Sequence, residues 1–284
     1  MKTVVAMRQP TPRLCGLEAF CGVATIATEF IQAGFPFHGA DILLDPDNHD
    51  LTTPAGFVYL LFMVLSFEAD AILWFATVCS SWIWLSRSST GRNKRMPLGT
   101  PHLCRSVEDG NTMVARSAVL MMLCAARHGW WALEQPAGSL MAQHPSLLYL
   151  HSIASMFPWL GWQNVTTSMA VFQAECSKPT HLYANNRFIK ALRRSKPKMF
   201  VPTNKDLVTF SYKADGTRQV TGSHGLKKTQ TYTRDFAKSV LKSYVTFRGN
   251  FAEDVDTEDL TLQEDGAIWE TARFDECVRY LEET

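Results

Sequence analysis

The sequence predicts an α/β fold built on a parallel sheet with helices on both faces. Residues 17–41 read as a strand, a glycine turn, a helix and a second short strand. The runs 70–78 and 130–133 are almost wholly apolar, as is typical of parallel strands that are buried on both faces. With 284 residues, 46% of them hydrophobic, the chain is long enough to bury a full core of this kind.

The segment 17–41 also has the order of residues expected for a nucleotide-type cofactor site. Its first apolar run ends at Phe20 and turns at Gly22, an alanine-rich helix follows, and the second strand ends on Asp41. The glycine lets the backbone approach a ligand, the helix N-terminus presents N–H groups, and the acid binds ribose hydroxyls. Because many α/β domains contain such a unit without a ligand, a site requires residues from later strands.

The polar loop after Asp41 holds a second acidic candidate, Asp50. This residue either places a carboxylate beside the same cofactor pocket or caps a local Asx turn. A helix over 53–67 is expected next, with Pro54 in its first turn.

Two later strands end in residues that can carry chemistry. The run 70–78 leads directly to Cys79, and a long polar and basic loop over 86–101 follows. After a predicted helix over 108–128, the run 130–133 leads to Glu134. In open α/β sheets, ligands bind at the carboxyl ends of the strands, where both residues should lie.

The rest of the chain divides by composition. We expect a cofactor-binding and catalytic core over 1–160, a basic target-contact region over 161–250 and an acidic tail over 251–284. Four further segments are predicted: a helix over 144–156, a strand over 163–170, a turn-rich segment over 176–186 and a helix over 233–244 capped by Thr233.

The charges are strongly segregated. Residues 1–250 hold 26 Lys and Arg against 15 Asp and Glu, whereas residues 251–284 hold 2 against 12. The basic excess is densest in 178–248, with 16 basic residues against 3 acidic ones. Such clustering either binds a polyanion, with nucleic acid the first candidate, or forms an ordinary solvated surface.

Composition also indicates the cellular compartment of the protein and the kinds of site that it lacks. The seven cysteines include no CxxC pair, which argues against a disulfide framework or a zinc ribbon and favours a reducing, intracellular compartment. The N-terminal sequence has no signal-peptide pattern, and the apolar run 55–67 is too short to span a membrane. We therefore expect no membrane association and no metal site.

Cys79, Glu134 and the glycine turn would serve one reaction together. A methyl group adds to a pyrimidine ring carbon only after that carbon becomes nucleophilic. A thiolate that attacks the neighbouring carbon achieves this when an acid protonates the ring nitrogen. The alternative is that Cys79 is a small core residue and Glu134 an ordinary capping or paired charge.

The order of these residues resembles that of the cytosine-C5 DNA methyltransferases, which use S-adenosylmethionine on a Rossmann-like sheet. The resemblance covers roughly 14–140 and the helix 233–244. It implies that Phe20 and Gly22 line the cofactor, that Asp41 binds its ribose and that Asp50 lies near its adenine. It also implies Cys79 as nucleophile and Glu134 as the residue that grips the cytosine ring nitrogen.

The chain departs from this family pattern at several positions. Ala24 stands in place of a second glycine, and Val78 stands in place of the proline before the nucleophile. A non-catalytic nucleic-acid-binding module on a decayed methyltransferase fold is therefore the alternative function. Amino-group methylation and phosphate-loop hydrolysis are disfavoured, because their motifs are missing.

A target base within duplex DNA would have to be flipped into the pocket. DNA is favoured over RNA as the partner, which places the protein in the nucleus if the organism is a eukaryote. The basic residues of the loop 86–101 are expected to contact phosphates and to lower the pKa of Cys79, and Lys178 is the candidate for the family's base-binding arginine. The expected nucleic-acid contacts are therefore Arg87, Arg92, Lys94, Arg95 and Lys178.

Overall fold

The structure, a computed structural model, describes residues 13–194, 207–212, 214–216, 218–222, 226 and 229–254. The described residues up to 246 form one compact unit. The acidic tail beyond residue 254 lies outside the described residues, and so does nearly all of the N-terminal segment 1–13.

The protein is an α/β structure with a mostly parallel sheet of six strands, in the order β2-β1-β3-β4-β6-β5. Strands β1 to β4 run parallel, whereas β6 runs antiparallel to both of its neighbours. This confirms the predicted fold class, and the sheet is consistent with a Rossmann-like fold. The strands are β1 (Leu14–Ala19), β2 (Phe37–Ala40), β3 (Phe67–Phe75), β4 (Trp130–Pro136), β5 (Gln163–Ser168) and β6 (Pro179–Ala184).

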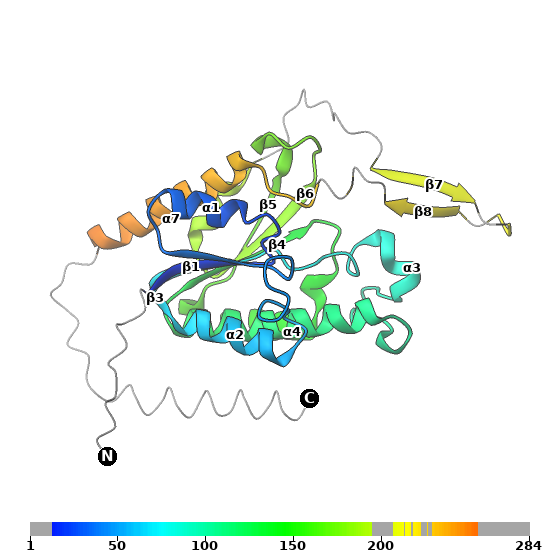
Figure 1. Ribbon diagram of the computed structural model, residues 1–284, viewed down its shortest axis with the longest axis horizontal. Helices are drawn as coiled ribbons and strands as arrows, with labels where there is room; N and C mark the ends of the chain where they lie inside the picture. Colours follow the sequence, from blue (N-terminus) through cyan, green and yellow to red (C-terminus); the bar gives the residue numbers. More distant parts are fainter. Residues whose placement is uncertain are drawn as a thin grey trace, which may run out of the picture. The chain divides into compact units, whose positions relative to one another are not determined.

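Helices cover both faces of this sheet. Figure 1 shows α1 and α7 on one face and α2 and α4 on the other. The rings of Phe30 in α1 and Tyr244 in α7 lie 5.3 Å apart, so these two helices pack together. The α-helices are α1 (Thr25–Gln32), α2 (Pro54–Leu65), α3 (Arg87–Thr90), α4 (Arg105–Ala126), α5 (Pro145–Met156) and α7 (Arg234–Asp254).

Short 3-10 helices and one hairpin complete the described elements. None of the described helices combines the length and the hydrophobicity that crossing a membrane requires. The remaining elements are η1 (Trp84–Ser86), η2 (Pro101–Leu103), η3 (Met141–Gln143), η4 (Pro158–Leu160), η5 (Met169–Phe172), η6 (Arg187–Leu192), β7 (Val208–Tyr212) and β8 (Arg218–Gly222).

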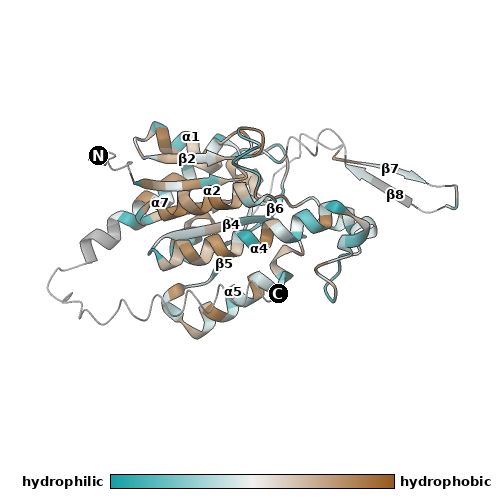
Figure 2. Cartoon of the chain, turned by 60° about the horizontal axis from the view of Figure 1, so that its bottom comes forward, coloured by the Kyte–Doolittle hydropathy of each residue, from teal (hydrophilic) through white to brown (hydrophobic). Residues whose placement is uncertain are grey.

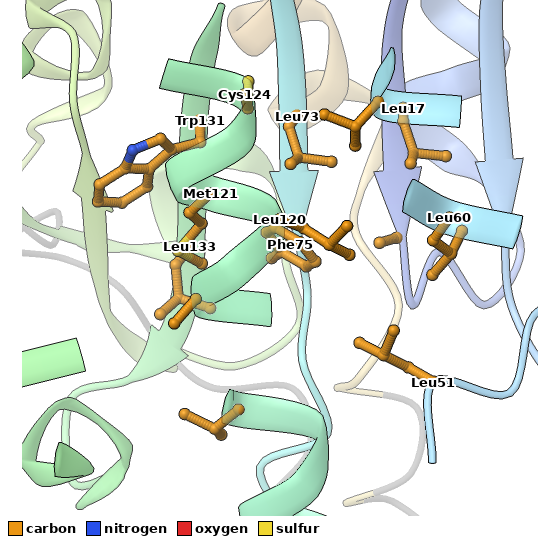
Figure 3. Packing of buried hydrophobic residues seen from close by; sticks show 14 of the residues in the cluster. Leu17, Leu51, Leu60, Leu73, Phe75, Leu120, Met121, Cys124, Trp131 and Leu133 are labelled. Atoms are coloured by element: carbon orange, nitrogen blue, oxygen red, sulfur yellow. The ribbon is translucent and has the colours of Figure 1, made fainter. Parts of the chain in front are cut away.

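The main core lies between the sheet and the helices α2 and α4. Figure 3 shows side chains of the sheet meeting side chains of α4, with Phe75 close to Leu120 and Leu133 close to Met121. Helix α2 carries no charged residue and is coloured hydrophobic along much of its length in Figure 2. Burial of this apolar surface fixes the ends of β1, β3 and β4 relative to one another.

The segment 176–186 differs from its prediction. We expected turns there, but the structure forms strand β6, which pairs with β4 and β5. Its Pro179 and its two asparagines look like turn residues, yet Pro179 begins the strand and the asparagines follow it, while Thr180, Leu182 and Ala184 are buried. Because β5 and β6 complete the main sheet, the expected division at residue 160 falls within one sheet.

The boundaries of other elements differ less from their predictions. Strand β3 ends at Phe75, four residues before Cys79, so Cys79 lies in the loop beyond the strand. Thr233 caps α7 as predicted, since its Oγ1 accepts a hydrogen bond from the Phe236 N–H at 3.2 Å.

The turn after β1 is conformationally strained. Phe20, Gly22 and Ala24 all have positive φ, at 59°, 55° and 54°. Glycine adopts this conformation freely, but a residue with a Cβ atom does so at a cost of about 1–2 kcal/mol. Strain of this kind is often stored where a loop must hold one geometry for a ligand.

Ala24→Gly should therefore raise the free energy of unfolding by about 0.5–1 kcal/mol, because it removes the strain at φ 54°. The matched control is Ala27→Gly in the interior of α1, which should lower stability by a similar amount. Urea unfolding of the two variants measures both effects. Equal destabilisation by both would show that the turn is unstrained.

Candidate functional site

Asp41 and the glycine turn are held together by a direct hydrogen bond. The Gly22 N–H donates to Asp41 Oδ2 at 2.9 Å, and the Leu43 N–H donates to Oδ1 at 2.9 Å. A Cβ atom placed on Gly22 would meet no atom within 4 Å, so the space over the turn is open. The turn lies at the carboxyl end of β1, next to β3, where the chain changes direction across the sheet.

Glu18 is a buried acid beneath this turn that our sequence analysis did not select. Its side chain is on β1 and is fully buried, and its Oε2 accepts a hydrogen bond from the Ala27 N–H at 2.8 Å. Among the described residues, its Oε1 has no hydrogen-bond partner. Desolvation, together with the nearby Asp41 charge, raises the pKa of Glu18 to about 8. The available signal was a charge inside the apolar strand LCGLEA.

Asp50 forms the Asx turn that was one of its two expected roles. Its Oδ1 accepts hydrogen bonds from the Thr52 N–H at 2.8 Å and from the Thr52 hydroxyl at 2.7 Å. Thr53 then caps α2 through the Gly56 N–H. A contact between Asp50 and a cofactor remains a prediction.

Glu134 lies near the carboxyl end of β4 and is buried, with 5% of its surface exposed. Its Oε1 lies 3.3 Å from Lys178 Nζ, just before β6, and its Oε2 accepts a hydrogen bond from the Tyr232 hydroxyl at 3.3 Å. The neighbouring Gln135 donates to the Thr77 carbonyl at 2.8 Å and so ties the end of β4 to the segment before Cys79. Glu134 is therefore a positioned, paired carboxylate.

Cys79 shares the electrostatic environment of this pair. Burial raises the pKa of its thiol, the charge of Glu134 raises it further, and the ammonium of Lys178 lowers it. Cys79 is thus a neutral thiol at rest. The expectation that the loop arginines lower its pKa is wrong, because the cation that acts on it is Lys178.

Arg92 is a structural residue. Its side chain is buried, and its guanidinium carbon lies 3.4 Å from the centre of the Trp82 ring. Its N–H groups donate to the side chains of Ser81 and Asn111 and to the carbonyls of Pro97 and Val107. Arg92 therefore links the loop after Cys79 to α4. Because these contacts enclose it, Arg92 is not available to a phosphate, contrary to its expected role.

The other loop cations, Arg87, Lys94 and Arg95, are exposed on the surface of the same loop. Lys178 has only 18% of its side chain exposed and is paired with Glu134. Desolvation alone would lower the pKa of Lys178, but the charges of Glu134 and Cys79 outweigh it and raise the pKa. Lys178 is thus placed to act beside Glu134 rather than along a nucleic-acid backbone.

Comparison with known proteins provides no relative from which the roles of these residues could be inferred. No protein-family model matches the chain, and no curated protein matches its sequence. Within the described residues, no cluster of three His, Cys, Asp or Glu side chains is arranged to hold a metal ion.

The electrostatic coupling at Cys79 can be measured by thiol alkylation. In a Cys104→Ser background, which removes another partly exposed thiol, Glu134→Gln should lower the pKa of Cys79, because it removes a neighbouring negative charge. Lys178→Met should raise it. The measurement is the rate of iodoacetamide reaction against pH, with near-ultraviolet circular dichroism to check folding. Identical profiles for all three proteins would contradict this arrangement.

Burial of Glu18 predicts a pH-dependent stability. Because its folded pKa is about 8 and its unfolded value 4.5, the stabilisation from protonated Glu18 is complete below pH 4.5 and is lost as the pH rises through 8. Glu18→Gln removes this dependence, so its stability relative to wild type should rise by about 1–3 kcal/mol between pH 5 and pH 8. Urea unfolding at several pH values measures the difference, and a constant difference would refute the shifted pKa.

Proposed function

We propose that the protein is a methyltransferase that uses S-adenosylmethionine and acts on C5 of cytosine in DNA. The observation that carries the proposal is the convergence of Cys79, Glu134 and Lys178 near the carboxyl ends of β3 and β4. A soft nucleophile, a carboxyl group and a cation in one partly buried site fit the activation of a pyrimidine ring. The turn that holds Asp41 lies at the same edge of the sheet, beside β3.

The residues at the turn fit the proposed cofactor. S-adenosylmethionine carries positive charge on its sulfonium and ammonium groups, and Glu18 offers a buried carboxyl oxygen with no partner among the described residues. Gly22 provides open space over the backbone, and Asp41 offers a carboxylate to the ribose hydroxyls. Phe20, whose ring lies 6.4 Å from that of Phe75, and Asp50 would complete the cofactor contacts.

The chain would act on the base as follows. The Cys79 thiol passes its proton to the Glu134 carboxylate, and its sulfur bonds to C6 of the cytosine. The ring electrons shift toward N3, and Glu134 delivers that proton there. The cofactor, when bound, supplies a methyl group to C5, and the electron pair of its carbon–sulfur bond stays on sulfur. Loss of the C5 proton to solvent water then restores the C5–C6 double bond and expels the Cys79 thiolate. The proton on N3 returns through Glu134 to the thiolate, which regenerates the resting thiol. Lys178 stabilises the anionic forms of both side chains.

A DNA partner is supported by charge alone. The exposed Arg87, Lys94 and Arg95 lie on the loop after Cys79, where they would contact phosphates around a flipped base. An enzyme with this substrate would act where the genome is kept, which is the nucleus in a eukaryote.

A second candidate is a non-catalytic nucleic-acid-binding module. The raised pKa of Cys79 favours it, since a thiol that is neutral at rest is a poor nucleophile until it loses its proton. The paired Glu134 opposes it. Burying this carboxylate beside Lys178 costs desolvation free energy, which is easier to explain if the carboxylate serves a reaction.

Calorimetric titration with S-adenosylmethionine tests the cofactor assignment. Wild type should bind, and Asp41→Ala should weaken binding at least tenfold, because the ribose loses its acceptor and the turn loses its bond to Gly22. Asp47→Ala, an exposed acid in the following loop, is the matched control and should bind normally. Absence of binding by the folded wild type would favour the non-catalytic module.

A further inference from the structure

A chain of hydrogen bonds reaches Glu134 from the segment just before α7. The Trp74 indole N–H, in the buried strand β3, donates to the Tyr232 hydroxyl at 3.2 Å. The Tyr232 hydroxyl donates to Glu134 Oε2 at 3.3 Å. Tyr232 is 98 residues from Glu134 in sequence, and our sequence analysis gave it no role.

The direction of this chain is fixed by its chemistry. An indole nitrogen can only donate, so the Tyr232 oxygen must accept from Trp74. The hydroxyl hydrogen is then free to point toward the carboxylate, which can only accept when it is ionised. Desolvation and the charge of Glu134 raise the pKa of Tyr232 well above 10, so the phenol keeps this hydrogen across the physiological range.

Packing holds the Tyr232 side chain in place. Its ring lies 4.9 Å from that of Phe236 and 6.3 Å from that of Trp74. The next residue, Thr233, caps α7 and donates to the Phe172 carbonyl, which fixes the backbone directly after Tyr232. Tyr232 therefore has little freedom to turn its hydroxyl away from Glu134.

The two side chains that contact the Glu134 carboxylate also line one cavity. A pocket of about 300 Å³ lies between the segments 169–178 and 229–233, and both Lys178 and Tyr232 line it. Lys178 lies within ion-pair distance of Oε1, and Tyr232 donates a hydrogen bond to Oε2, so each carboxylate oxygen has its own contact.

We propose that Tyr232 is a positioning residue that orients Glu134 for the reaction at Cys79, so that the segment returning before α7 completes the catalytic site. This inference rests on the proposed function. In this role Tyr232 acts on Glu134 through the hydrogen bond of its hydroxyl group and does not contact the substrate. A carboxylate that is free to rotate would meet the ring nitrogen less often in the productive geometry.

The test is a double-mutant cycle with Tyr232→Phe, Glu134→Ala and both together, because alanine, unlike glutamine, leaves the Tyr232 hydroxyl no side-chain acceptor at this position. Tyr183→Phe, on the neighbouring strand β6, is the matched control, because it also removes one partly buried hydroxyl. Urea unfolding of all five proteins should show that the two changes are coupled, by about fivefold in the unfolding equilibrium constant. This readout needs no enzymatic activity.

The same proteins are then assayed with tritiated S-adenosylmethionine and sheared genomic DNA. Tyr232→Phe should lower kcat about 10- to 100-fold, leave KM for DNA nearly unchanged and alter the pH profile of kcat. Tyr183→Phe should do none of these. In the Glu134→Ala background, the loss of the Tyr232 hydroxyl should have no further effect on the rate.

The possible outcomes distinguish the role of Tyr232 from the proposed function itself. Additive unfolding energies would overturn the link between Tyr232 and Glu134. Coupled unfolding energies with an unchanged kcat in an active enzyme would overturn the positioning role. An inactive wild type that binds no S-adenosylmethionine would overturn the proposed function and with it the catalytic meaning of Tyr232.

Discussion

The buried ion pair between Glu134 and Lys178 is the interaction on which the site depends. Removing two charges from water costs several kcal/mol, and only close pairing with further hydrogen bonds offsets this cost. The sheet makes the pairing possible, because β6 runs antiparallel beside β4 and therefore begins where β4 ends. Lys178, one residue before β6, is thus brought to the carboxyl end of β4. Tyr232 then supplies the hydrogen bond that the second carboxylate oxygen needs.

The same edge of the sheet carries a second set of buried polar groups at the end of β1. There the backbone bends through three residues of positive φ, and Asp41 holds the bend through the Gly22 N–H. Glu18 is buried beneath the bend with one oxygen unpartnered in the described structure, so its desolvation is not fully compensated by the protein. An uncompensated acid beneath a strained turn is the feature expected of a binding site, where a cationic ligand would supply the missing partner.

Much of this arrangement could be predicted from the sequence, since buried parallel strands have nearly continuous apolar runs and ligands gather where such strands end. The positions of Glu134, Gly22 and Asp41 in or just after β4, β1 and β2 were predicted in this way, whereas Cys79 lies four residues beyond the end of β3. Strand β6 was missed because its pattern is set by pairing with β4 and not by local propensity. Arg92 was misassigned because a basic loop residue looks solvated until Trp82 and α4 are seen to enclose it. Tyr232 acts across 98 residues of sequence, a relation that only the tertiary structure supplies.

The most direct test of the central claim is covalent trapping of Cys79 on DNA. A duplex that contains 5-fluorocytosine allows attack at C6 and methylation at C5, but fluorine cannot leave as a proton does, so the adduct persists. We expect a denaturation-resistant protein–DNA complex that forms only with S-adenosylmethionine and whose peptide adduct maps to Cys79 by mass spectrometry. Absence of the complex across a library of duplexes, from protein that binds both DNA and S-adenosylmethionine, would contradict Cys79 as the nucleophile.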